Sequence, residues 1–182
     1  MMTSNGTRRL SRVALIAAYV GVALVVNCTI SWWPPQKVLG IEMPPGLLLV
    51  GAIFVMRDYT QQIIGSWVIP FTLLAAVLTY YFVGEDVGIA SGAAFAVSET
   101  IDWLVFKLTK RDLKDRILIS SLIAVPFDGL IFLGKMGWID WQHFWTEELF
   151  WVHFALKMIA SVLMWVWLDH RSRNRNLTVP AE

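Results

Sequence analysis

Residues 91–103 read SGAAFAVSETIDW, and this stretch decides how the chain must fold. Glu99 and Asp102 stand one helical turn apart, so an α-helix carries both carboxylates on one face. Ser91 and Ser98 fall on the same row as Asp102, and the remaining positions are mostly small or apolar. The stretch therefore predicts a helix whose polar face is turned into a bundle.

The chain as a whole has the composition of a membrane protein. Of its 182 residues, 57% are hydrophobic and 16% are charged, and the mean hydropathy is +0.58. Soluble domains have about 25% charged residues. The length suits one compact unit, and the single cysteine, Cys28, excludes a disulfide, a cysteine zinc site or an iron–sulfur cluster within one chain.

Apolar runs separated by proline and glycine predict six transmembrane helices, because one span takes about 20 mainly apolar residues. The predicted spans are 13–31, 45–64, 67–83, 87–107, 117–136 and 149–168. Pro44 and Pro45 suit the first turn of the second helix. We therefore expect an all-α polytopic membrane protein with a membrane domain at 13–168. Residues 1–12 and 169–182 form its terminal segments, with disorder from Asn176 onward.

Basic residues predict the orientation of the spans. Most of the 15 lysines and arginines fall in three clusters: Arg8, Arg9 and Arg12; Lys107, Lys110, Arg111, Lys114 and Arg116; Arg171, Arg173 and Arg175. The positive-inside rule places these clusters in the cytoplasm, and six spans place both termini there as well. We expect a multi-pass protein of the inner membrane, with the lipid bilayer as a partner and no nucleic acid.

Charged side chains within the predicted spans must face one another, a cavity or a ligand, since each costs about 2.5–3.5 kcal/mol near the middle of the bilayer. The set comprises Arg57, Asp58, Glu99, Asp102, Asp128 and Lys157. Two cations stand against four carboxylates, a formal sum of −2. Either some carboxyl groups are protonated, or a cationic or donor-rich ligand completes the site.

Structural alternatives exist for several of these polar residues. Arg57 and Asp58 can form a structural pair, Lys157 can be a counter-ion only, and the serines can bond backbone carbonyls. His153 fits a packing or interfacial position. By contrast, Glu99 and Asp102 exceed what helix packing needs, and the small residues from Gly88 to Ala96 allow a neighbouring backbone to approach closely.

A serine in the fourth span and a histidine in the sixth resemble the arrangement of rhomboid intramembrane proteases. That family has glycine two positions before its nucleophile, whereas Ile89 stands there, and the stretch around His153 lacks glycine. No phosphate-binding G-x-x-x-x-G-K-[ST] loop is present, and the three histidines lack metal-ligand spacing. We therefore expect no enzyme, no cofactor and no metal.

Three segments carry a resemblance to a known family: MPPGLLLVGAIFVMRDYTQQIIG (43–65), SGAAFAVSETIDWLVF (91–106) and PFDGLIFL (126–133). They resemble the queuosine precursor transporter family, also called the vitamin uptake transporter (VUT) family, and the resemblance covers about residues 12–168. It implies a six-helix inner-membrane importer of 7-deazaguanines such as 7-cyano-7-deazaguanine or its aminomethyl relative. The implied fold is similar to that of the substrate-binding subunits of energy-coupling-factor transporters. The resemblance also implies that transport takes place without the ATPase of those systems.

The resemblance also implies a substrate site between the second, fourth and fifth helices. Residues that match the family's polar intramembrane positions are Arg57, Asp58, Glu99, Asp102 and Asp128. Asn27, Gln61, Ser98 and Lys157 join them as candidate ligands of a purine-like molecule, whose ring N–H and NH2 suit a carboxylate. The alternative is a vitamin-binding subunit that needs a partner ATPase, and the sequence leaves open a partner ATPase or a homo-oligomer.

Overall fold

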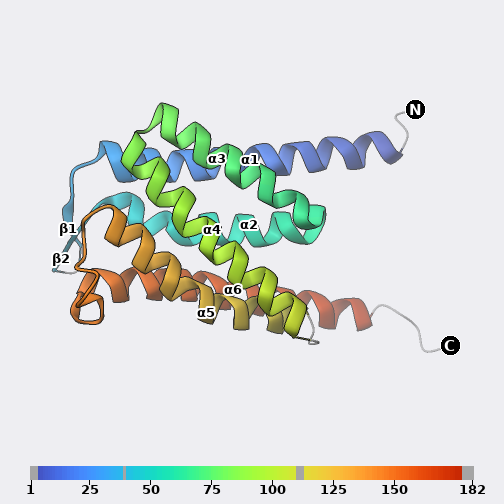
Figure 1. Ribbon diagram of the computed structural model, residues 1–182. Helices are drawn as coiled ribbons and strands as arrows, with labels where there is room; N and C mark the ends of the chain where they lie inside the picture. The colour runs from blue at the N-terminus through green and yellow to red at the C-terminus, as the bar shows by residue number, and fades with distance from the viewer. Residues whose placement is uncertain (1–3, 39, 110–112, 178–182) are drawn as a thin grey trace.

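The computed structural model describes residues 4–38, 40–109 and 113–177, and six α-helices account for most of these described residues (Figure 1). They are α1 Ser4–Trp32, α2 Val50–Ile64, α3 Val68–Phe82, α4 Glu85–Leu108, α5 Leu113–Lys135 and α6 Glu148–Leu177. Each predicted span overlaps one of these helices. The helical fold class and the order of the helices are therefore confirmed.

The connection between α1 and α2 differs from the prediction. It contains a short antiparallel hairpin of β1 Gln36–Val38 and β2 Ile41–Met43, with Gln36 paired to Met43. The next residues, Pro45–Leu49, form a 3-10 helix, η1, in which the Leu47 amide donates to the Pro44 carbonyl at 3.0 Å. The α-helix expected from position 45 therefore begins only at Val50, and the prolines lie in the 3-10 turn that precedes it.

The two terminal helices are longer than their predicted spans. α1 begins at Ser4, and α6 continues to Leu177. The disorder expected from Asn176 is wrong for Asn176 and Leu177, which complete α6, and positions 178–182 lie outside the described residues. Two further 3-10 turns, η2 Gly65–Trp67 and η3 Phe144–Thr146, precede α3 and α6.

The six helices pack as a closed ring. Going round it, α1 packs on α2, α2 on α6, α6 on α5, α5 on α4, α4 on α3, and α3 again on α1. The start of α1 and the end of α6 lie at one end of the bundle, which we call the terminal end, and the hairpin lies at the opposite end, the hairpin end (Figure 1). A ring of six helices leaves an interior that every helix can reach.

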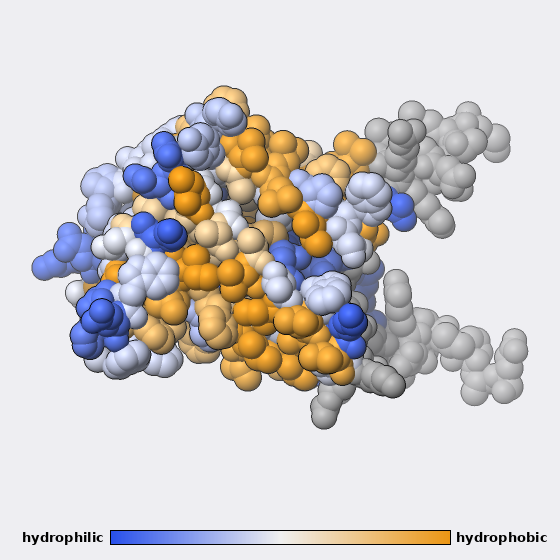
Figure 2. Space-filling view, in the orientation of Figure 1, coloured by the Kyte–Doolittle hydropathy of each residue, from blue (hydrophilic) through white to orange (hydrophobic). Residues whose placement is uncertain are grey.

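The outer surface of the bundle suits a membrane. Four helical segments among the described residues are long and apolar enough to cross one: Ser11–Trp32, Gly65–Phe82, Ile117–Lys135 and Glu148–Arg171. Large apolar side chains such as Leu73, Phe82 and Leu163 are more than half exposed. Figure 2 shows hydrophobic residues across the middle of one face and hydrophilic residues gathered toward the hairpin end. This is the surface of a helical membrane protein.

Gly88 and Gly92 of the G-x-x-x-G stretch are not equivalent. A Cβ at Gly88 would lie 2.5 Å from the Tyr80 Cα of α3, whereas a Cβ at Gly92 would meet only the Ala76 Cβ, at 3.6 Å. The close helix approach predicted from the small residues therefore occurs at Gly88.

We predict that Gly88→Ala destabilises the protein and that Gly92→Ala does not. Overpacking against a backbone costs about 1–3 kcal/mol, while alanine gains about 0.5–1 kcal/mol over glycine inside a helix. Thermal unfolding in detergent should give a lower Tm for the first variant and an equal or higher Tm for the second. Equal Tm values for both would contradict the close packing of α3 on α4.

Candidate functional site

One arginine crosses the interior of the ring. Arg57 of α2 donates through Nη2 to Glu99 and Asp102 of α4, and its Nη1 lies 3.2 Å from Asp58 Oδ1. Arg57 is 3% exposed and its three carboxylate partners are buried. α2 and α4 are not adjacent in the ring, so this ionic bridge joins opposite walls. We call it the Arg57 bridge.

A second ion pair links the neighbouring helices α5 and α6. Lys157 Nζ donates to Asp128 Oδ2, and both side chains are buried. Ser98 Oγ of α4 lies 3.5 Å from the other carboxylate oxygen of Asp128. The Lys157 ammonium also lies 4.8 Å from the centre of the Phe54 ring of α2. Asp128 is thus held by α4 and α6 together.

Neutral hydrogen bonds connect α1 to α3 and α4. The hydroxyls of Tyr19 and Thr72 are 2.6 Å apart, and Asn27 Nδ2 donates to Thr79 Oγ1 of α3 at 3.0 Å. Ser91 Oγ of α4 donates to Asn27 Oδ1 at 3.4 Å. Ser91 therefore bonds an amide, and this geometry describes no nucleophile–base pair.

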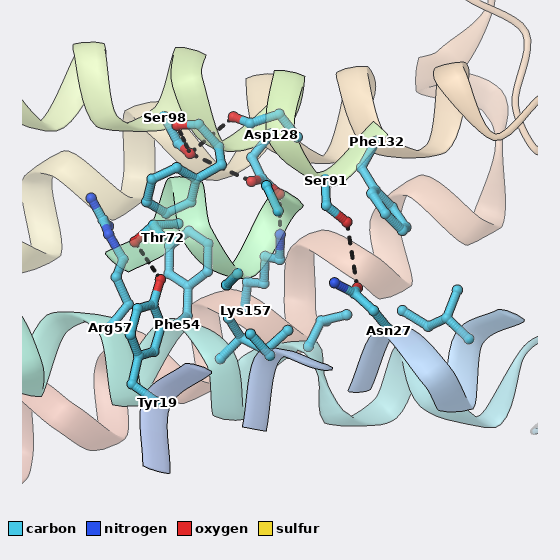
Figure 3. A pocket seen from close by; sticks show the side chains of 18 of the residues that line it. Tyr19, Asn27, Phe54, Arg57, Thr72, Ser91, Ser98, Asp128, Phe132 and Lys157 are labelled. Carbon is cyan, nitrogen blue, oxygen red and sulfur yellow. Dashed lines mark hydrogen bonds and ion pairs between the residues drawn. The ribbon is translucent and has the colours of Figure 1, made fainter. Parts of the chain in front are cut away.

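These groups surround a cavity of about 90 Å³ in the middle of the ring (Figure 3). All six helices contribute to its lining, and the polar and charged lining residues are Tyr19, Asn27, Arg57, Thr72, Ser91, Ser98, Asp128, His153 and Lys157. In Figure 3, Arg57, Tyr19 and Thr72 lie on one side of Lys157, while Asn27 and Phe132 lie on the other. Because α1 begins at the terminal end, the side of Tyr19 and Arg57 is the terminal end of the cavity.

The structure brings five of the nine predicted site residues to the cavity: Asn27, Arg57, Ser98, Asp128 and Lys157. Asp58, Glu99 and Asp102 do not line it, because they contact the guanidinium of Arg57 instead. Gln61 lies on α2 one turn beyond Arg57 and does not line the cavity either. The substrate site was predicted to lie between α2, α4 and α5. The cavity is wider than this, since α1, α3 and α6 also contribute lining residues.

Sequence reasoning missed four polar residues of the cavity, and His153 is the one without a hydrogen-bond partner among the described residues; the other three are Tyr19, Thr72 and Ser91. His153 was expected to pack or to lie at the membrane interface, but it is 1% exposed and lines the cavity. The interfacial position is therefore wrong. Its one available signal was the four-residue spacing to Lys157, which places both side chains on one face of α6.

The ring and its cavity define a class of protein: a helical membrane protein with a polar, charged cavity at its centre. Among the described residues, no group of three or more histidine, cysteine, aspartate or glutamate side chains could hold a metal ion. Comparisons of the chain with protein-family models, curated proteins and solved structures found no match. The function is therefore inferred from the cavity and from the residues that line it.

We predict that Lys157→Met lowers stability and that adding Asp128→Leu restores it. The single change leaves a buried carboxylate without its cation, which costs about 3–5 kcal/mol, whereas replacing both members of a buried pair by apolar residues is often neutral or stabilising. Tm values of the single and double variants in detergent measure this coupling. A double variant less stable than Lys157→Met would contradict the prediction, because Asp128 would then stabilise the protein through more than its ion pair with Lys157.

Proposed function

We propose that the protein imports a 7-deazapurine precursor of queuosine, such as 7-cyano-7-deazaguanine, across the inner membrane. The observation that carries the proposal is the central cavity, because residues of all six helices line it. A molecule bound there contacts the whole ring, so binding can be coupled to movement of the helices. In this proposal all six helices span the membrane, and both termini are cytoplasmic.

The cavity offers the groups that a deazaguanine needs. The Asp128 carboxylate accepts from several donors at once, so it can bond the ring N–H and the NH2 group while it keeps Lys157. Lys157 and Asn27 supply donors for the ring carbonyl. Phe54 and Phe95 also line the cavity and offer aromatic faces to a flat ligand.

The length of the cavity also suits a two-ring molecule. Ser91 and Ser98 line it from the same helix, and the helix rises about 10 Å between them at 1.5 Å per residue. Along this length the polar residues alternate with apolar ones such as Ala94 and Phe132. This mixture of apolar walls and few polar groups is typical of small-molecule sites.

The Arg57 bridge lies at the terminal end of the cavity, which the proposal places toward the cytoplasm. Arg57 lines the cavity, and its partners Glu99 and Asp102 lie further toward the end of α4 than Ser98. A substrate therefore enters from the hairpin end, and its release to the cytoplasm requires the bridge to open.

The proposal predicts saturable uptake of 7-cyano-7-deazaguanine by liposomes that contain only this purified chain. Asp128→Asn should reduce uptake at least about tenfold, because the amide replaces a charged acceptor and loses one charge-assisted hydrogen bond of about 1.5–3 kcal/mol. Uptake of the radiolabelled compound measures this effect. The matched control is Asp86→Asn, an exposed carboxylate in the first turn of α4, which should transport like the unmodified protein.

The same assay separates the competing functions. Binding of the compound without uptake would favour a binding subunit that needs a partner ATPase. Stabilisation by a vitamin and not by any 7-deazapurine would contradict the substrate class, since a ligand raises Tm only if it binds the folded state. Equal uptake by Asp128→Asn and the unmodified protein would contradict the cavity as the transport site.

A further inference from the structure

His153 is a buried polar side chain whose polar atoms are unused. Within the described residues, neither Nδ1 nor Nε2 has a hydrogen-bond partner, although the side chain is 1% exposed. A neutral imidazole carries one donor and one acceptor. Leaving both unpaired in a low-dielectric interior costs free energy, so such a group in a native protein calls for a functional explanation.

The neighbours of His153 fix its ring at the cavity wall. The Phe132 ring is stacked nearly parallel to it, with an interplanar angle of 9° and centroids 6.1 Å apart. On the α5 side, a Cβ at Gly129 would lie 2.9 Å from His153 Nδ1. The backbone of α5 therefore reaches the imidazole because position 129 is a glycine. Both rings line the cavity, so a bound molecule can contact the imidazole.

His153 is offset along α6 from Lys157. α6 begins at the hairpin end, so His153 is one helical turn nearer that end than Lys157. A 7-deazaguanine whose N–H and NH2 edge meets Asp128 carries its substituent at position seven on the opposite edge. With the molecule on the hairpin side of Asp128, that edge faces the end of the cavity where His153 lies.

We propose that His153 binds the transported molecule directly, through a hydrogen bond between a ring nitrogen and the substituent at position seven. This inference rests on the proposed function, since it needs a 7-deazapurine in the cavity. His153 then distinguishes substituents, whereas Asp128 and Lys157 hold the guanine-like edge that all such compounds share. A ring that only filled space would need no nitrogen, and phenylalanine would replace it without loss.

The test replaces the imidazole by apolar groups of similar size, His153→Phe and, if that variant fails to fold, His153→Leu. Dissociation constants are measured for 7-cyano-7-deazaguanine, 7-aminomethyl-7-deazaguanine and unsubstituted 7-deazaguanine, and Tm is measured without ligand. We expect a higher Tm without ligand, because two unpaired buried polar atoms are removed. Affinity for the preferred substituted compound should fall about three- to tenfold, and affinity for 7-deazaguanine should not change.

Two further variants sharpen the comparison. Gly129→Ala keeps the imidazole but crowds its Nδ1, so it should weaken binding of the substituted compound in the same direction. His143→Phe alters a largely exposed histidine that bonds Asp140 in the loop before η3, and it should leave all three affinities unchanged.

The outcomes separate this inference from the function on which it rests. If the unmodified protein binds none of the three compounds, the proposed function fails and the role of His153 fails with it. If it binds them and His153→Phe binds all three equally well, only the role of His153 is overturned.

Discussion

A buried guanidinium among three carboxylates is the constraint on which the rest of the structure depends. Arg57 cannot lose its proton in a protein, and it lies inside an apolar ring where an unpaired charge is costly. Its carboxylate partners come from its own helix and from the opposite wall of the ring. α2 and α4 are thereby held across the interior at the terminal end of the cavity.

The division of charges around the cavity follows from this bridge. Because Glu99 and Asp102 are engaged by Arg57, the carboxylate that faces the cavity is Asp128, with Lys157 beside it. The cavity thus offers a ligand the Asp128–Lys157 ion pair, the Arg57 guanidinium, several neutral polar groups and aromatic walls. The proposed 7-deazapurine has donors and acceptors on one edge and a flat face, so it can use both the polar groups and the aromatic walls.

The helices were predictable because proline and glycine divide the chain into apolar runs, and the polar face of α4 followed from the spacing of Glu99 and Asp102. Which helices pack together was not predictable. Helical periodicity predicts the face of a helix on which a residue lies, but not which other helix packs against that face. The closed ring, which brings α1, α3 and α6 to the cavity, depends on long-range packing. His153 was missed for the same reason, since its burial depends on Phe132 and Gly129 of another helix.

The most direct measurement is a crystal structure of the unmodified protein grown with 7-cyano-7-deazaguanine. The ligand should lie in the central cavity, with its N–H and NH2 edge within hydrogen-bond distance of Asp128 and its flat face against Phe54 or Phe95. The Arg57 bridge should remain closed on the terminal side if access is from the hairpin end. A ligand bound outside the ring, or a cavity that stays empty at a saturating concentration, would contradict a substrate site between the six helices.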